Sequence, residues 1–139
     1  FKNKTVIVNG HAGFKGSWLS LWLASLGANV IGISNNIPTE PSHFELIKLK
    51  NKMKSINCDV SNFKKLKNII YKSKPNFIFH LAAQAIVKKS YEDPYKTWKT
   101  NLIGTLNLLE ILRGYNKKNL VSIFITSDKV YKNIETKIR

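Results

Sequence analysis

The chain has 139 residues, of which 43% are hydrophobic and 22% are charged, a profile typical of one soluble globular domain that excludes a disordered or fibrous chain. Its formal net charge of +15 raises the question of nucleic-acid binding. However, only Arg113 and Arg139 are arginines, and the lysines are spread over the whole chain, whereas recognition surfaces favour arginine. We therefore expect a solvated basic surface and no nucleic-acid partner.

Runs rich in β-branched and aromatic residues alternate along the chain with stretches of helical spacing. Uninterrupted apolar runs are typical of strands covered on both faces of a parallel sheet. The runs that we expect to form strands are residues 5–9, 29–34, 54–58, 76–81 and 120–126. The stretches that we expect to form helices are residues 16–26, 43–50, 61–72 and 94–113.

Two of these helices carry further local signals. In the first, Trp18, Leu19, Trp22 and Leu26 recur at helical spacing, so we expect them to form its packed face. The last helix has the clearest boundaries. Asp93 can cap it, Pro94 suits its first position and Gly114 follows its last turn. Its apolar positions are Leu102, Ile103, Leu106, Leu109 and Leu112.

Alternation of strands and helices predicts an α/β fold with a doubly wound parallel sheet, the Rossmann-like arrangement of dinucleotide-binding domains. In such a sheet, ligands bind outside the carboxyl ends of the strands. Residues 35–44 carry Pro38 and Pro41 and are expected to form an irregular loop after the second strand.

A glycine-rich segment follows the first expected strand directly. Gly10, Gly13 and Gly16 have the spacing GxxGxxG and open the first expected helix. The first glycine permits a tight turn, the second lets the backbone approach a pyrophosphate, and the third lets the helix pack on the strand. The alternative is that all three serve only turns and packing.

An acidic residue about twenty positions further on would hold the adenosine ribose of NAD. Here the end of the second strand reads Ile33-Ser34-Asn35-Asn36, without an acid and without a basic side chain for a 2′-phosphate. These residues therefore leave open which of the two dinucleotides, NAD or NADP, the chain would prefer.

Five segments together resemble the extended short-chain dehydrogenase/reductase superfamily, and within it the nucleotide-sugar 4,6-dehydratases that act on CDP-glucose. The segments are GHAGFKGSWLSLWL after the first strand, CDVSN after the third, FHLAAQ in the fourth, TNLIGTLNLLE in the last helix, and TSDKVY after the fifth strand. GHAGFKGSWL and TSDK are the narrower signals, because the other three occur across many epimerases and dehydratases.

The resemblance implies that NAD is the cofactor. It assigns the pyrophosphate site to Gly10, His11, Gly13, Phe14, Lys15 and Gly16. It assigns the adenine to Asp59 and Val60 and the nicotinamide half of the cofactor to Leu81, Ala82 and Ala83. It also assigns Asn101 to organising the active site. A plain loop role for Asp59 and a backbone-bonding role for Asn101 are the open alternatives, and His80 reads as a satisfied residue at a strand end.

The reaction implied by the resemblance converts a nucleotide sugar to its 4-keto-6-deoxy form by internal hydride transfer and loss of water. Ser127 would bind the sugar hydroxyls, and Asp128 would be the acid if burial raises its pKa. Lys129 departs from the glutamate of related dehydratases, and it would act as a base only with a lowered pKa and otherwise as an anchor. The alternative is an ordinary turn at residues 126–129.

The superfamily also uses a YxxxK pair on a later helix. The pair Tyr95 and Lys99 has that spacing but lies before the fifth strand, so we do not interpret it as catalytic. We therefore expect residues 1–139 to be the amino-terminal part of a dinucleotide-binding domain, inactive alone and forming a homo-oligomer at full length.

The alternatives are another dehydratase or epimerase of the superfamily and a non-catalytic dinucleotide-binding module. We expect no membrane contact and a cytoplasmic location, because the longest apolar stretch is short and Cys58 is the only cysteine. His11, His43, His80 and Cys58 show no paired ligand spacing, so we expect no metal site.

Overall fold

A computed structural model describes residues 1–116 and 118–127. Its five strands form one parallel sheet in the order β3-β2-β1-β4-β5, which confirms the predicted fold class. The strands are β1 (Thr5–Asn9), β2 (Asn29–Ser34), β3 (Lys54–Asn57), β4 (Phe77–His80) and β5 (Val121–Phe124). The ends of each strand lie within two residues of the predicted bounds. β-branched runs indicate where a strand is, but they do not define its last residues.

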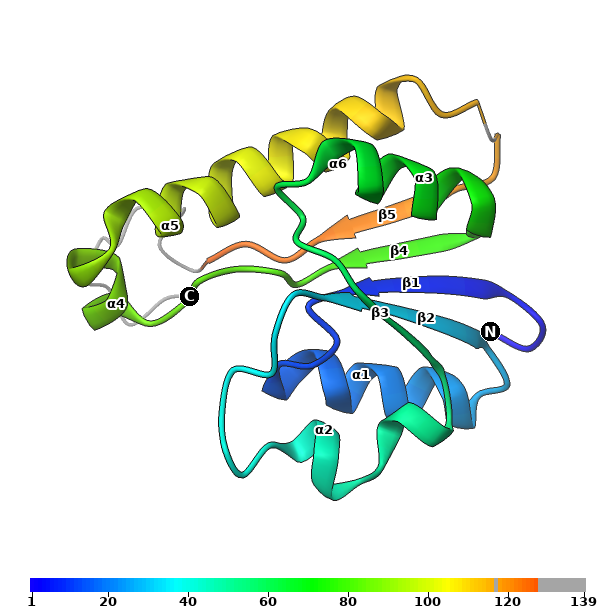
Figure 1. Cartoon of the computed structure of the whole chain (residues 1–139). Helices are drawn as coiled ribbons and strands as arrows, with labels where there is room; N and C mark the ends of the chain where they lie inside the picture. Colours follow the sequence, from blue (N-terminus) through cyan, green and yellow to red (C-terminus); the bar gives the residue numbers. More distant parts are fainter. Residues whose placement is uncertain (117, 128–139) are drawn as a thin grey trace, which may run out of the picture.

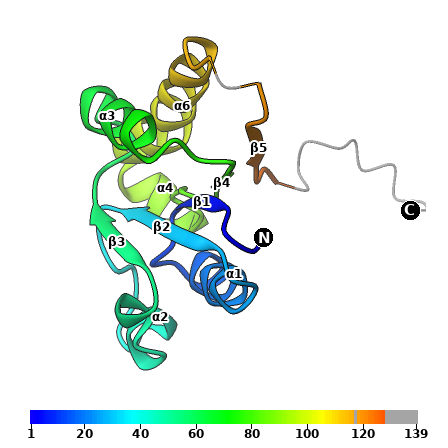
Figure 2. The ribbon, with the colours of Figure 1, turned by 90° about the vertical axis from the view of Figure 1, so that its right-hand side faces the viewer.

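Helices cover both faces of this sheet, as a doubly wound fold requires. Figure 1 shows α1 (Phe14–Ser25) and α2 (His43–Leu46) on one face, with α3 (Phe63–Ser73) and α6 (Gly104–Arg113) on the other. The shorter elements are α4 (Val87–Glu92), α5 (Pro94–Trp98), the 3₁₀ turn η1 (Leu49–Asn51) and the π-helical turn η2 (Lys99–Ile103). Figure 2 shows β3 and β5 at opposite edges of the sheet.

The core lies on both sides of the central strand β1. Its side chains alternate between the two faces. Val6 and Val8 pack with Leu23 of α1 on one side, and Ile7 packs with Leu66 of α3 on the other. This strand therefore holds the α1 layer and the α3–α6 layer around one sheet.

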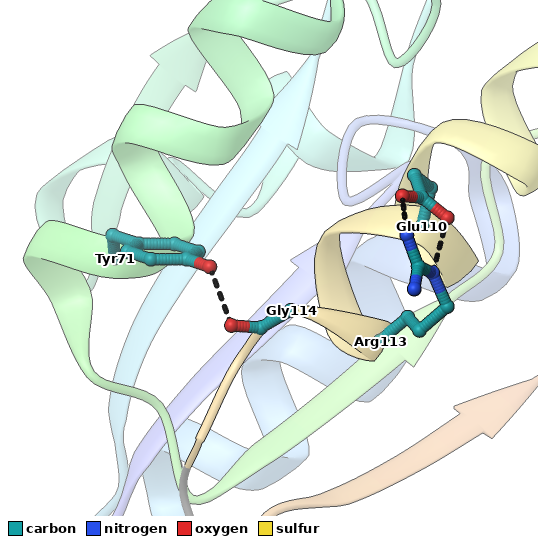
Figure 3. A network of polar contacts seen from close by, with 4 residues as sticks. All are labelled: Tyr71, Glu110, Arg113 and Gly114. Atoms are coloured by element: carbon teal, nitrogen blue, oxygen red, sulfur yellow. Dashed lines mark hydrogen bonds and ion pairs between the residues drawn. The ribbon is translucent and has the colours of Figure 1, made fainter.

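The far end of α6 is tied to α3 by a polar contact. The Tyr71 hydroxyl donates a hydrogen bond of 2.9 Å to the carbonyl of Gly114, directly after α6 (Figure 3). One turn earlier, the Arg113 guanidinium binds both carboxylate oxygens of Glu110 on the exposed side of the same helix. The Tyr71 contact joins α3 to the end of α6, whereas the Arg113–Glu110 pair lies within α6.

The predicted helix at residues 94–113 forms in three pieces. A π-helical turn, η2, separates α5 from α6, and Leu106 and Leu109 remain about half exposed. The buried residues of α6 are instead Gly104, Leu108 and Ile111. Leu106 and Leu109 share one side of the regular helix α6 and the buried residues share another, so apolar spacing alone does not identify the packed face.

The predicted packed face of α1 is wrong for three of its four residues, because only Leu19 packs against the core. Trp18, Trp22 and Leu26 are exposed, and the buried residues of the helix are Gly16, Ser17, Ser20 and Leu23. Small residues are buried at the start of the helix because Gly16 lies in close contact with Gly10 of the glycine loop. Apolar spacing alone pointed to the bulky side chains, which lie on the outer face.

Two smaller differences concern the rest of the chain. The predicted helix at residues 43–50 is split, because Lys48 adopts a left-handed conformation with φ of 49° between α2 and η1. Strand β5 forms the edge of the sheet, and Val121 and Ile123 are exposed rather than covered. Within the described ranges, no helix has the length and apolar character needed to cross a membrane.

Candidate cofactor-binding site

A cleft of about 540 Å³ opens at the carboxyl ends of β1, β2 and β4. Strand order reverses here, because β1 leads on to β2 at one side and lies beside β4 at the other, and ligands of doubly wound sheets bind at such a point. The predicted residues that line the cleft are Gly10, Gly13, Asp59, Val60, Leu81, Ala82 and Ala83. The other cleft-lining residues are Ile33, Ser34, Asn35, Asn36, Pro38, Cys58 and Thr100.

Two glycines of the loop allow backbone contacts that no other residue permits. Gly10 has a φ of 87°, and a Cβ at this position would lie 2.8 Å from the backbone nitrogen of Ala82. A Cβ on Gly16 would overlap the carbonyl of Gly10. At Gly13 the added Cβ would meet only the Gly10 carbonyl, at 3.4 Å. Gly10 and Gly16 therefore fold the loop, and Gly13 leaves its surface open toward the cleft.

The loop is also fastened to β2. The Gly10 N–H donates to the Ile33 carbonyl at 2.7 Å, and the Ala12 N–H donates to the Ser34 hydroxyl at 3.2 Å. These two hydrogen bonds fix the position of the glycine loop relative to the sheet. The first turn of α1 then presents its backbone N–H groups at the cleft, where a helix N-terminus favours an anion.

His11 is buried behind the loop rather than in the cleft. Its Nε2 lies 2.8 Å from the Ser55 hydroxyl of β3, and burial lowers the pKa of its imidazole. Its ring occupies space beside Gly32, where a Cβ would overlap it. His11 lines a second cavity of about 820 Å³, with Ser34 and Lys50 among its neighbours. It is therefore a supporting residue of the loop, beside the predicted pyrophosphate site.

The Asp59 carboxylate is held by hydrogen bonds at the edge of the cleft. Its Oδ1 accepts from the Ser61 N–H at 2.8 Å, and its Oδ2 accepts from the Asn35 side chain at 3.0 Å. Burial opposes ionisation, but the bonds from Ser61 and Asn35 and the charge of Lys99 outweigh it and lower the pKa of Asp59. The loop role of Asp59 is thus present, and the residue also lines the cleft.

The neighbouring residue Val60 is positioned from α6. The Asn107 amide donates to the carbonyls of Val60 and Ser61 at 3.1 and 2.9 Å. Gly104 lies so close that a Cβ there would press on the Val60 side chain. The post-β3 loop therefore depends on α6 for its shape.

Residues after β4 are fixed by Asn101. Its Oδ1 accepts from the Gln84 N–H at 2.7 Å, and its Nδ2 donates to the Gln84 carbonyl at 3.0 Å. Asn101 lies in the π-turn η2, a type of turn often found at functional sites. Asn101 therefore has the backbone-bonding role that we gave as its alternative. The backbone that it bonds, at Gln84, directly follows residues 81–83, which line the cleft.

A buried chain of hydrogen bonds runs beneath this segment. The Asn9 amide lies 3.3 Å from Nδ1 of His80, and Nε2 of His80 lies 3.2 Å from the Thr105 hydroxyl, which donates to the Asn101 carbonyl at 2.7 Å. Because the Asn9 Nδ2 is a donor, Nδ1 of His80 accepts and its Nε2–H donates. Burial lowers the pKa of His80 to about 4, so the ring is neutral at pH 7. His80 supports the site without lying in it.

The comparisons with known proteins agree with this geometry. The family model described as GDP-mannose 4,6 dehydratase matches residues 7–138. The chain belongs to this family.

One relative is a CDP-glucose 4,6-dehydratase from Salmonella typhimurium. It is 47% identical to this chain over 135 residues, which is 97% of the chain. A UDP-glucose 4-epimerase from Thermotoga maritima, solved with UDP-glucose, is 32% identical with a TM-score of 0.75 over 86% of the chain and 37% of its own. The epimerase from Brucella ovis, solved with NAD, is 30% identical with a TM-score of 0.72 over 87% of the chain and 35% of its own. The family member therefore lies in the nucleotide-sugar dehydratase and epimerase superfamily. It spans 37% of the length of the Salmonella typhimurium relative.

The predicted site residues divide into four groups. Seven line the cleft, as given above. Phe14, Lys15, Gly16 and Asn101 lie beside it without lining it, and His11 lines the second cavity. Ser127 follows β5 in an exposed segment, whereas Asp128 and Lys129 lie outside the described residues. No group of three or more His, Cys, Asp or Glu side chains that could hold a metal ion occurs within residues 1–116 and 118–127.

Several supporting residues were not predicted. Gly32, Ser55 and Asn107 act through contacts between segments distant in sequence, so no local pattern marks them. At the end of β2, the sequence showed only that an acid is missing, whereas Ser34 accepts from the glycine loop and Asn35 donates to Asp59.

Proposed function

We propose that this chain forms the NAD-binding part of a nucleotide-sugar 4,6-dehydratase whose substrate is CDP-glucose. The observation that carries the proposal is the cleft at the strand-order reversal, where Gly10 lies directly against Ala82 and Gly13 leaves the loop open. A glycine loop that opens onto a helix N-terminus is the arrangement that holds a pyrophosphate in doubly wound sheets.

The residues present fit the pyrophosphate, the adenine and the nicotinamide half of NAD, whereas the end of β2 offers no acid for the adenosine ribose. Gly10, Gly13 and the first turn of α1 would hold the pyrophosphate. Asp59 would accept from the adenine amine, and the short side chains of Ala82 and Ala83 leave space for the nicotinamide half. When bound, NAD supplies a temporary acceptor for a hydride from the sugar, so the reaction has no net redox change.

The chain's own residues would handle the protons of the dehydration. Ser127 would bind the sugar hydroxyls, and Asp128 would give a proton to the hydroxyl that leaves C6 as water. Removal of the C5 proton needs a base, and Lys129 would serve only if its pKa is lowered; otherwise it anchors the substrate. These three roles rest on the resemblance of the TSDK segment.

CDP-glucose is proposed as substrate because the relative named for that reaction is 47% identical to this chain, above the epimerases at about 30%. The test is to incubate the full-length protein with NAD and CDP-, UDP- or GDP-sugars and to follow 4-keto-6-deoxy product by NMR. We expect product from CDP-glucose and none from D128N, with NAD binding retained in D128N. Product only from another nucleotide sugar would overturn the substrate, and NAD binding with no product from any sugar would favour a non-catalytic module.

The location and assembly follow the same proposal. Cys58 is a buried free thiol, compatible with a reducing cytoplasm. We propose a cytoplasmic homo-oligomer, with a nucleotide sugar as the small-molecule partner. Cell fractionation that finds the protein with the membranes, or a monomer in sedimentation, would contradict these two points.

A further inference from the structure

The second cavity, which His11 lines, adjoins the cofactor cleft at the end of β2. Ser34 and Asn36 line both the cleft and this cavity. The other walls of the cavity come from the glycine loop, α2, η1 and β3. A group bound in the cleft beside Ser34 and Asn36 can therefore extend into the second cavity.

The adenosine ribose of a bound dinucleotide would lie at this boundary. In the proposed NAD site, the pyrophosphate lies at Gly13 and the adenine at Asp59, and the ribose joins these two groups. In doubly wound folds, an acid at this place binds the ribose 2′-hydroxyl, and a basic side chain accommodates a 2′-phosphate. Here the end of β2 has no carboxylate that would repel a phosphate. A phosphate on the 2′-oxygen would therefore enter the second cavity.

The cavity receives a cation from η1, not from β2. Lys48 has a left-handed φ of 49° and turns the chain after α2. Leu49 is fully buried and packs with Ala12 and Phe44, which fixes η1 against the glycine loop. The next residue, Lys50, lines the cavity, and its Nζ lies 5.9 Å from the centroid of the Phe44 ring. The fold thus supplies the basic side chain that the sequence after β2 lacks.

The charge of Lys50 is available to a ligand in the cavity. Neither of the two ion pairs within residues 1–116 and 118–127 involves Lys50. Burial lowers the pKa of His11, and the positive charge of Lys50 adds to that lowering. The Ser34 hydroxyl accepts from the Ala12 N–H, so its own proton can be donated to a phosphate oxygen. An ammonium and a hydroxyl are suitable donors for charge-assisted hydrogen bonds to a phosphate.

We propose that the second cavity is a phosphate-monoester subsite that takes the 2′-phosphate of NADP, with Lys50 as its cation and Ser34 as a donor. The chain then binds NADP as well as NAD. The inference rests on the proposed function, because the place of the ribose follows from the proposed pyrophosphate and adenine sites. Lys50 is a residue for cofactor specificity, distant from the reacting atoms.

Calorimetric titration of the full-length protein with NADP and with NAD tests this subsite. In Lys50→Met we expect about tenfold weaker NADP binding, from the loss of a charge-assisted hydrogen bond, and unchanged NAD binding. The matched control is Lys52→Met, which removes the same charge from a residue that does not line the cavity. It should change neither affinity.

The outcomes separate this subsite from the proposed cofactor site. Saturable NAD binding without NADP binding, or equal NADP affinity in wild type and Lys50→Met, would overturn the subsite alone. An equal loss of NADP affinity in Lys52→Met would also overturn it, because the effect would then come from general charge. If neither dinucleotide binds, the proposed cofactor site fails together with the subsite.

A second test needs no variant. Adenosine 2′,5′-bisphosphate and adenosine 3′,5′-bisphosphate carry the same charge and differ only in the place of one phosphate. We expect the 2′,5′ isomer to bind more tightly, and its advantage over AMP to shrink as salt is raised. Equal affinity of the two isomers would mean attraction to the net charge of +15 alone and would overturn the subsite.

Discussion

The two ends of the cleft are built by different means. At the glycine-loop end (residues 10–16), backbone lies directly on backbone, and glycines at 10 and 16 make that approach possible. At the post-β4 end (residues 81–84), the backbone is held from outside by the side chain of Asn101 and, beneath it, by His80. The first end depends on the absence of side chains and the second on their hydrogen bonds. The two should therefore fail differently when they are changed.

The largest effect is expected from Gly16→Val. The added side chain overlaps the Gly10 carbonyl, so the helix must move, at a cost of about 3 kcal/mol or more in unfolding free energy. Urea unfolding and NAD titration should both show the loss. Gly13→Ala is the control, because its Cβ has room: NAD affinity should fall while stability stays near wild type. Equal loss of stability in both variants would show that the two glycines have the same role.

The next effect is a pH dependence that belongs to the post-β4 end. Burial lowers the pKa of His80 to about 4, against an ordinary value of 6.5, so the unfolded chain takes up the proton first. Stability is complete above pH 6.5 and is lost as the pH falls toward 4, by about 3 kcal/mol. His11 contributes in the same direction.

Urea unfolding at a series of pH values checks this loss. The control is His80→Gln, which should be less stable at pH 7 but should lose less on acidification. If the variant and wild type lose the same free energy between pH 6.5 and 4, other groups than His80 cause the loss.

A smaller effect is expected from Asn101→Ala, which leaves the N–H and carbonyl of Gln84 without their partner. Two lost hydrogen bonds amount to about 2 kcal/mol. Because the segment lines the cleft, NAD affinity should fall together with stability. Asn107→Ala serves as a comparison, since it frees the post-β3 loop and not the post-β4 segment. Hydrogen exchange of the Gln84 amide should become faster in Asn101→Ala and stay unchanged in Asn107→Ala. A Gln84 amide that stays protected in both variants would contradict the role of Asn101.

The smallest effect is expected from Asp59→Asn, which removes a charge and keeps the shape. The carboxylate is ionised at neutral pH, and we expect about tenfold weaker NAD binding with little change in stability. Calorimetric titration of both proteins measures this difference. Unchanged affinity would leave Asp59 with its loop role alone.

The contrast between the ends also explains what could be predicted. Gly10, Gly13 and Gly16 were recognisable because a strand, a turn and a helix follow one another locally. The bond from Asn101 to Gln84 spans 17 residues and a π-turn, so spacing could not indicate its partner. The packed face of α1 was missed for a related reason. Gly16 brings the helix so close to the glycine loop that the small residues Ser17 and Ser20 are buried, whereas Trp18 and Trp22 lie at the surface.

The most direct measurement is a calorimetric titration of the full-length protein with NAD, with Gly13→Ala alongside it. The proposed cleft predicts saturable binding at one site per chain, weakened in Gly13→Ala although that variant stays folded. The absence of saturable binding at millimolar NAD, or equal affinity in the two proteins, would contradict a dinucleotide site at the glycine loop.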